Sequence, residues 1–310
     1  MSAPLHIDTP LIESGVFRAP GGGTVLFKMD ALQPSGSFKL RGVGRLCAAA
    51  AVDGARAIVC PSGGNAGFAA AYAGQRLGMA VTVVVPETTS PEARNAIAAA
   101  GADVHVHGAD FDAADAQARQ VAAATGAVHV HPFDHPLLWD GHATLIDEVV
   151  RAGATFDCVV TSVGGGGLLL GILAGLARNG LGDIPVIAVE TEGAASLHAA
   201  LAADRVVSLP AITSIATSLG ARSVSPAAFD AAKRKLVIPL QVNDADAVAA
   251  CLRFADAHRV LVEPACGAAI AALTARADVL TRFERPLVEI CGGIGVSLDR
   301  LADWRAHLAN

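Results

Sequence analysis

The sequence predicts an α/β fold with two open, mainly parallel, twisted sheets and helices on both faces. Two observations support this prediction. Short runs rich in β-branched residues alternate with alanine-rich helical runs, a pattern typical of parallel strands joined by crossover helices. The chain has 310 residues, which is long enough for two such units with well-buried cores.

The strands and helices follow in order along the first half of the chain. An apolar strand-like run at 24–27 comes first, and β-branched runs then predict strands at 57–60, 80–85, 103–106 and 128–130. Pro86 stops the second of these strands. Alanine-rich stretches between the strands predict helices at 65–77, 91–100 and 112–125.

The second half repeats this pattern. A strand at 158–161 leads through a glycine run into an apolar helix that ends near residue 177, and strands follow at 186–190 and 287–291. Glu263 opens a further helix, where its charge favours the N-terminus, and we assign it no catalytic role. We interpret the chain as two domains, a small one of residues 41–133 inserted into a large one of residues 1–40 and 134–310.

The composition favours small-molecule chemistry. Apolar residues make up 53% and aromatic residues 4%, so the core must be aliphatic and alanine-rich. The net charge is -6, with both signs interspersed, and neither a nucleic-acid footprint nor a polybasic membrane patch is visible. No uninterrupted apolar run of about 20 residues predicts a membrane span. We expect a soluble cytoplasmic protein with no nucleic-acid or membrane partner.

The cysteines indicate neither a zinc site nor disulfides. They do not form paired Cys-x-x-Cys motifs, and the N-terminus lacks the basic and apolar regions of a secretion signal. The six are scattered, mostly within apolar runs, at Cys47, Cys60, Cys158, Cys251, Cys266 and Cys291.

Lys39 is the candidate nucleophile. It lies in the segment Gln33-Pro34-Ser35-Gly36-Ser37-Phe38-Lys39-Leu40-Arg41-Gly42, among small hydroxyl residues and glycines and beside an aromatic ring. Partial burial there would lower the pKa of the amine, so that the free base can attack a carbonyl and hold it as a Schiff base. Taken alone, the residue could also be an ordinary lysine at the start of a helix.

Two glycine-rich turns are candidate anion sites. Gly164 to Gly167, followed by Leu168, stand where a strand passes into a helix, which suits a phosphate; a tight turn rarely needs four glycines. The run is not a Walker A loop and is a weak dinucleotide fingerprint. The segment from Ser62 to Gly67 suits a substrate carboxylate, with the alternative that Ser62 simply caps the next helix.

Two further segments attract attention. Cys291 ends a strand, at the edge where open α/β sheets bind ligands, although a lone cysteine there is more often inert packing. The segments around His131 and His142 could suggest metal or acid–base chemistry, and we favour a hinge with ordinary polar contacts.

Together these residues resemble the fold-type II pyridoxal-phosphate enzymes, the tryptophan-synthase-β-like group, and within it the short serine/threonine dehydratases. Ser35 to Lys39 is similar to the cofactor-lysine motif, Ser62 to Gly67 to the substrate loop, and Gly164 to Leu168 to the phosphate loop. Cys291 matches the position that contacts the pyridine nitrogen. Pro132-Phe133-Asp134 and Val262-Glu263-Pro264-Ala265 match as well, so the resemblance covers essentially the whole chain.

The resemblance implies a site and a reaction. Lys39 would bind pyridoxal 5'-phosphate and then remove the α-proton of L-serine or L-threonine, so that the β-hydroxyl leaves and a 2-keto acid and ammonia are released. A homodimer is also implied. The other cofactor contacts would be Phe38, Asn65, Gly164, Gly165, Gly166, Gly167, Leu168 and Cys291. The substrate contacts would be Ser62, Gly63, Gly64 and Asn65. A monovalent cation, K⁺ or another, would lie on Glu190 and the carbonyls of Ala194, Leu219 and Ala221.

Alternatives within and outside the family remain. Gly63 stands where racemases of the family carry a serine, which argues against racemisation, and it leaves room for a bulkier substrate such as a β-aryl serine. β-Elimination or β-replacement on another β-substituted amino acid is therefore the alternative. A dinucleotide-dependent oxidoreductase would leave Lys39 unexplained. Ile294 and Gly295 depart from the polar residue that often follows Cys-Gly-Gly, and the chain ends soon after Cys291, so we expect no regulatory domain.

Overall fold

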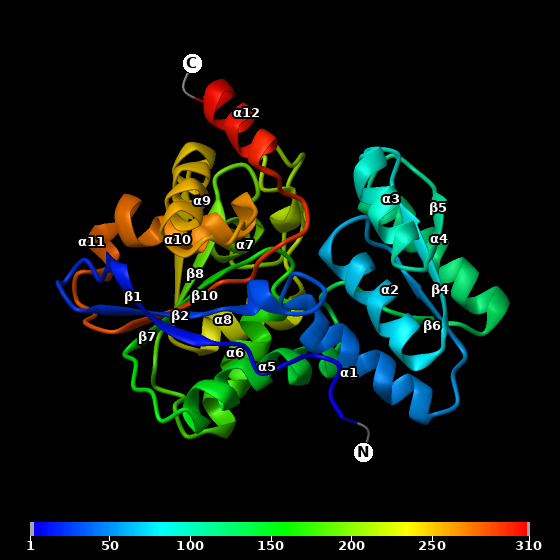
Figure 1. Cartoon of the computed structure of the whole chain (residues 1–310), viewed down its shortest axis with the longest axis horizontal. Helices are drawn as coiled ribbons and strands as arrows, with labels where there is room; N and C mark the ends of the chain where they lie inside the picture. Colours follow the sequence, from blue (N-terminus) through cyan, green and yellow to red (C-terminus); the bar gives the residue numbers. More distant parts are fainter. Residues whose placement is uncertain (1–2, 309–310) are drawn as a thin grey trace. The chain divides into compact units, whose positions relative to one another are not determined.

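The strands form two separate sheets, one in each of two parts of the chain, as the alternating pattern predicts. A computed structural model describes residues 3–308 (Figure 1). Its first unit contains residues 33–142 with the N-terminal segment up to Ile7, and its second contains residues 8–32 and those from Ala143 onward. The expected domain boundaries at 40/41 and 133/134 stay a prediction, because compact packing does not show which segments move together.

The first unit is a sheet of short strands that alternate with helices. Its elements are α1 (Lys39–Val52), β3 (Ala57–Cys60), α2 (Asn65–Leu77), β4 (Ala80–Val85), α3 (Pro91–Ala99), β5 (Asp103–Val106), α4 (Phe111–Thr125) and β6 (Val128–His129). The helix α5 (Pro136–Arg151) follows and contributes residues to both units.

The second unit is larger and uses both ends of the chain. Its strands are β1 (Leu11–Arg18), β2 (Thr24–Lys28), β7 (Cys158–Ser162), β8 (Val186–Thr191), β9 (Val237–Val242) and β10 (Pro286–Glu289). Its helices are η1 (Asp30–Leu32), α6 (Gly167–Arg178), α7 (Ser196–Ala203), η2 (Thr217–Leu219), α8 (Pro226–Arg234), α9 (Asp244–His258), α10 (Pro264–Ala275), α11 (Ala277–Leu280) and α12 (Leu298–Leu308).

The sheet of the first unit has the strand order β5-β4-β3-β6, with all pairs parallel. Its two central strands, β3 and β4, are largely buried on both faces, whereas the edge strands β5 and β6 are more exposed. Ile58 and Cys60 pack on the core formed with α1 and α2, whereas Val59 and Val84 pack against Ala114 and its neighbours on α4. The helices therefore cover both faces of this sheet, as predicted.

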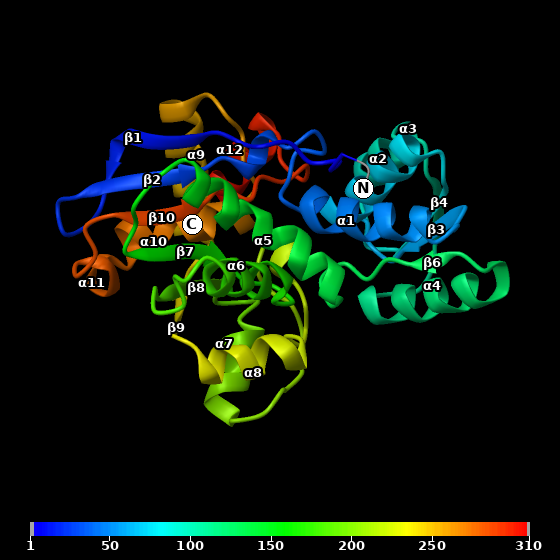
Figure 2. The ribbon, with the colours of Figure 1, turned by 90° about the horizontal axis from the view of Figure 1, so that it is seen from below.

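The sheet of the second unit has the order β1-β2-β10-β7-β8-β9. Among the described strands of this sheet, β1 alone runs antiparallel to its neighbour. Figures 1 and 2 show α9 and α10 on one face and α6 and α8 on the other. Pro239 lies in β9, the edge strand, where a residue without a backbone N–H costs no ladder bond on the outer side.

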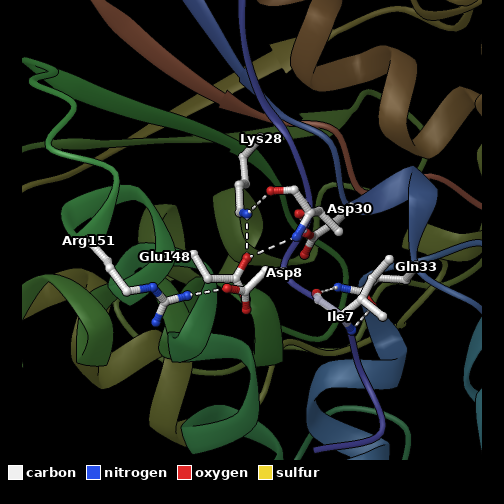
Figure 3. A network of polar contacts seen from close by, with 8 residues as sticks. Ile7, Asp8, Lys28, Asp30, Gln33, Glu148 and Arg151 are labelled. Carbon is white, nitrogen blue, oxygen red and sulfur yellow. Dashed lines mark hydrogen bonds and ion pairs between the residues drawn. The ribbon is translucent and has the colours of Figure 1, made fainter.

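A buried ion pair joins three segments of the second unit (Figure 3). Lys28, at the end of β2, is 1% exposed and pairs with Glu148 of α5. The Lys28 Nζ also donates to the Thr9 carbonyl at 2.7 Å, and the Thr9 N–H donates to Glu148 at 3.2 Å. The Thr9 hydroxyl donates to Asp30 at 2.7 Å, so both charges and the entering chain are bound together. Nearby, Arg151 pairs with Asp8.

Between residues 3 and 308, the structure contains no helix with the length and apolar character that a bilayer crossing requires.

We expect Lys28→Met to lower the free energy of unfolding by about 3–5 kcal/mol, because it leaves the Glu148 charge buried without its partner. The double variant Lys28→Met/Glu148→Leu should recover most of that loss, since both charges are then gone. Chemical denaturation of Lys28→Met, Glu148→Leu and the double variant measures the coupling energy between the two side chains. Additive losses would show that the pair does not act as a unit.

Candidate active site

Lys39 is the first residue of α1 and is half-buried. Its Nζ donates a hydrogen bond to the Pro132 carbonyl at 2.7 Å and lies 5.0 Å from the centroid of the Phe38 ring. A positive charge is disfavoured at a helix N-terminus, so this position suits an amine that must also exist without its proton. The amine is thus held by a carbonyl and a ring rather than released to solvent.

The ring of Phe38 is itself supported from within the first unit. His142 is buried against it, with ring centroids 4.9 Å apart. Burial holds the pKa of His142 well below its usual value, and the charge of Lys39 lowers it further. His142 is therefore a neutral packing group against Phe38, and within the described residues neither of its ring nitrogens makes the ordinary polar contacts that the sequence analysis favoured.

The substrate-loop candidate joins β3 to α2. The helix begins at Asn65, which is 7% exposed, and its N-cap is Gly64. The structure gives this described end of α2 no side-chain cap, so its first backbone N–H groups suit an anion. Ser62 does not cap the helix; its hydroxyl accepts a 3.4 Å hydrogen bond from the N–H of Gly64 within the loop.

The space beside Gly63 is occupied. A Cβ atom at this position would lie 2.5 Å from both Cγ2 and Oγ1 of Thr89, which follows β4. The expectation that Gly63 leaves room for a bulkier substrate is therefore wrong. Thr89 also brings a hydroxyl to the place where position 63 has none, so Gly63 alone no longer argues against racemisation. The sequence offered no signal for this contact, because the two loops are far apart in the chain and meet only in the folded structure.

The glycine run connects β7 to α6 in the second unit. Gly166, the N-cap of α6, has φ +95°, and a Cβ atom there would lie 2.3 Å from that of Ala228. At Gly164 a Cβ atom would meet Leu219 Cα at 3.1 Å. Glycine is thus required by close packing as well as by conformation. No side chain in the described structure caps α6, which leaves its first N–H groups and its dipole available for a phosphate.

Cys291 lies two residues beyond β10, which ends at Glu289 rather than at the cysteine as predicted. Because β10 pairs with β7, Cys291 lies beside the strand that leads to the glycine run, and its Sγ is 3.7 Å from the hydroxyl of Ser162. A hydrogen bond with Cys266 and burial raise the pKa of the Cys291 thiol well above its usual value. The thiol is therefore neutral and reacts poorly as a nucleophile.

Glu263 is a buried acid that sequence reasoning placed only at a helix start. It is 5% exposed, and a Cβ atom at Gly293, which has φ +130°, would lie 2.0 Å from its carboxyl carbon. Its Oε2 would lie 3.2 Å from a Cβ atom at Gly295. The glycines on either side of Ile294 thus admit this carboxylate where the family often has a polar side chain. The Gly-Ile-Gly spacing was the sequence signal that could have indicated room for a side chain beside this segment.

The proposed cation ligands lie on β8 and in the chain after it. The Glu190 carboxylate is buried and accepts hydrogen bonds from the N–H groups of Leu197 at 2.7 Å and His198 at 2.8 Å. Burial raises its pKa to about 7, against the opposing effect of these two donors. Leu219 lies against Gly164, beside the glycine run, and its carbonyl accepts from the N–H of Ala221 at 2.8 Å.

The cation site would have a single acid. Ala194 is fully buried in the loop between β8 and α7. Across the described part of the chain, no three His, Cys, Asp or Glu side chains gather as a metal site. A cation here would depend on backbone carbonyls together with Glu190, a donor set of hard oxygens that suits K⁺ or Na⁺ better than a transition metal.

The groups described in the two units, each taken by itself, match the chemistry that pyridoxal phosphate requires. The first has an amine for an aldehyde and an uncapped helix for a carboxylate. The second has an uncapped helix for a phosphate and a neutral thiol near the same sheet edge. The donor sets fit the cofactor.

Comparisons with known proteins agree with this chemistry. A rat protein named serine dehydratase-like is 43% identical over 98% of this chain and 95% of its own length. Human L-serine dehydratase/L-threonine deaminase is 43% identical over 98% of this chain and 96% of its own. The crystal structure of an L-serine ammonia-lyase from the fungus Rhizomucor miehei has a TM-score of 0.89 at 33% identity, covering 98% of this chain and 99% of that one.

These similarities confirm the predicted fold, enzyme class and cofactor. The model of the pyridoxal-phosphate dependent enzymes matches residues 3–292, which include all the candidate site residues. The chain therefore belongs to the family of pyridoxal-phosphate dependent enzymes.

Proposed function

We propose that the chain is an ammonia-lyase that converts L-serine and L-threonine to a 2-keto acid and ammonia. The observation that carries this proposal is the Lys39 amine, half-buried at the start of α1 with its Nζ 2.7 Å from the Pro132 carbonyl. The names of the rat, human and fungal relatives support the same reaction, and each is matched over at least 95% of its length.

We assign the cofactor contacts to residues of the motifs described above. When bound, pyridoxal phosphate supplies an aldehyde that condenses with amines and a ring that withdraws electrons from the substrate α-carbon. The N–H groups at the start of α6 would hold the phosphate, from Gly164, Gly165, Gly166, Gly167 and Leu168. Phe38 would lie against the ring, Asn65 would bond the ring hydroxyl, and Cys291 would face the ring nitrogen.

The neutral thiol at Cys291 favours elimination. A buried carboxylate at that position would hold a proton on a pyridine nitrogen, whereas a neutral thiol does not. The ring is then a weaker electron sink, so the β-hydroxyl must leave promptly. Glu263 is also buried, and its charge adds to the raised pKa of the Cys291 thiol.

Lys39 is the base in this proposal. The substrate carboxylate would bind the uncapped start of α2, at Ser62, Gly63, Gly64 and Asn65, which orients the α-carbon. The amine of Lys39 would take the α-proton and become an ammonium, and the β-hydroxyl would leave as water after it gains a proton. The Pro132 carbonyl accepts a hydrogen bond from that ammonium.

We also propose three properties beyond the reaction: a bound cation, a compartment and an oligomeric state. We propose K⁺ or another monovalent cation on Glu190 and the carbonyls of Ala194, Leu219 and Ala221. We also propose a cytoplasmic homodimer; six free, buried cysteines are compatible with a reducing compartment.

Lys39→Ala should abolish release of keto acid and ammonia, because it removes both the cofactor anchor and the base. Borohydride reduction of the wild-type holoenzyme should fix the cofactor on Lys39, as mapped by peptide mass spectrometry. The chain has four lysines, and exposed Lys235→Ala is the matched control that should retain full activity. Normal turnover by Lys39→Ala, or an adduct on another lysine, contradicts the mechanism.

Gly63→Ala should lower kcat/KM by about tenfold, because the new methyl group collides with Thr89 and overpacking costs about 1–3 kcal/mol. The double variant Gly63→Ala/Thr89→Ala should regain most of the activity, since the obstructing atoms are gone. Steady-state kinetics on L-serine tests both. An unchanged Gly63→Ala enzyme would show that Thr89 does not fill this space. If the wild-type enzyme formed D-serine in place of keto acid, the protein would be a racemase and the lyase proposal would be wrong.

K⁺ should raise the free energy of unfolding of the holoenzyme more at pH 8 than at pH 5.5. Because the pKa of Glu190 is raised to about 7, the native state binds one proton more than the unfolded state between about pH 4.5 and 7, so stability falls as pH rises through that range. A bound cation favours the carboxylate and offsets this loss.

Tetramethylammonium at equal ionic strength is the control for that experiment, and Glu190→Ala should remove the difference between the two cations. Identical unfolding in K⁺ and tetramethylammonium at pH 8 would contradict the cation site.

A further inference from the structure

The turn that carries the Pro132 carbonyl is built by residues to which the proposed function gives no role. It follows β6, whose neighbour in the sheet is β3, and Val130 continues the ladder with an N–H to the Val59 carbonyl at 2.7 Å. The turn therefore leaves the sheet at the same edge as the substrate loop. Pro132 has a restricted φ and no N–H, so the direction of its carbonyl is set by its neighbours.

His131 closes this turn from one side. Its Nδ1 accepts hydrogen bonds from the N–H of Phe133 at 3.2 Å and from that of Asp134 at 2.8 Å. An atom that accepts two N–H groups carries no proton itself, so the ring must be the neutral form protonated at Nε2. The ring is held edge-on against Phe133 and Phe111, with centroids 4.5 Å and 6.0 Å away.

The surroundings keep His131 neutral. Its pKa is lowered to about 4, mainly by burial; the carboxylate of Asp115 opposes this shift, and the charges of His129, Arg119 and Lys39 add to it. That carboxylate is engaged elsewhere, by His129 at 2.8 Å and Arg119 at 2.7 Å. The Nδ1 acceptor is thus present throughout the neutral pH range.

Trp139 of α5 closes the turn from the other side. Its indole Nε1 donates to the Phe133 carbonyl at 2.9 Å. Phe133 is therefore fixed at both its N–H and its carbonyl, and the peptide before it, which includes the Pro132 carbonyl, has little freedom to rotate. A short hydrogen bond from Lys39 at 2.7 Å completes the arrangement.

We propose that His131 is a positioning residue for Lys39: its Nδ1 fixes the turn so that the Pro132 carbonyl points at the Lys39 amine and holds the ammonium that this amine becomes. A hydrogen bond from an ammonium to a carbonyl is stronger than one from a neutral amine. The turn thus favours the protonated product of α-proton removal. The catalytic meaning rests on the proposed function; the geometry does not.

The test compares two variants that separate the acceptor from the ring. His131→Asn keeps an acceptor at Oδ1 but removes the ring, whereas His131→Phe keeps the ring and removes the acceptor. The full chain, freed of cofactor, is labelled with trace acetic anhydride at pH 7.5, and labelling of Lys39 is compared with that of exposed Lys235 in the same sample. Only the free amine reacts, so the ratio measures its fraction.

We expect His131→Phe to raise the Lys39 labelling ratio about tenfold, the loss expected for one charge-assisted hydrogen bond. His131→Asn should stay within about twofold of the wild type. Wild-type ratios in both variants, or equal rises in both, would overturn the proposal. If His131→Phe does not fold, Trp139→Phe removes the other brace and should raise the ratio in the same direction; an unchanged ratio would overturn the proposal too.

Catalysis provides an independent readout. In the loaded enzyme His131→Phe should lower kcat with little change in KM, and His131→Asn should restore it; equal loss of kcat in both variants would overturn the proposal. Absence of keto-acid release from the wild type would remove the proposed function, but the labelling result would still decide the role of His131.

Discussion

The ion pair of Lys28 and Glu148 is the interaction on which the second unit depends. Two buried charges are tolerable only while both are present, because either one alone would keep its full desolvation cost. Their geometry fixes the end of β2, and the backbone there brackets Ile290: its N–H donates to the Lys28 carbonyl at 2.9 Å, and its carbonyl accepts from Ala31 at 2.7 Å. Cys291 is the next residue. The charge pair therefore helps to fix the backbone from which the Cys291 side chain projects.

The two helices proposed to bind the substrate carboxylate and the cofactor phosphate share a different constraint. Both α2 and α6 begin at a glycine N-cap that offers no side-chain acceptor in the described structure, so their first N–H groups lack the cap that α3, α4, α8 and α9 receive from Ser90, Asp110, Ser225 and Asn243. With glycine at the N-cap, the missing side-chain acceptor costs only about a few tenths of a kcal/mol. Binding of a carboxylate at α2 and a phosphate at α6, as proposed, would satisfy these N–H groups.

Local patterns in the sequence predicted the elements whose environment is uniform. The strands at 57–60 and 80–85 agree with β3 and β4, because apolar runs rich in β-branched residues suit strands buried in a parallel sheet. The strand at 103–106 agrees with β5, a largely exposed edge strand in which polar residues alternate with valine. β9 was missed because Pro239 is tolerated only at an edge, and edges are defined by the whole sheet. The site motifs were visible for the same local reason. Thr89 beside Gly63 was not, since that contact depends on how two separate loops pack. The two hydrogen bonds that His131 accepts lie within one turn, a segment that the sequence analysis interpreted only as a hinge.

The buried thiols give the protein a means of reporting its own motions. All six are at most 4% exposed, and burial raises the pKa of Cys47 to about 12 and contributes to the raised pKa of each of the other five thiols. An alkylating reagent can reach such a sulfur only after local opening. Cys47 and Cys60 lie in the first unit and the other four in the second. The rate at which each thiol is alkylated thus measures how often its own unit opens locally, without any engineered probe.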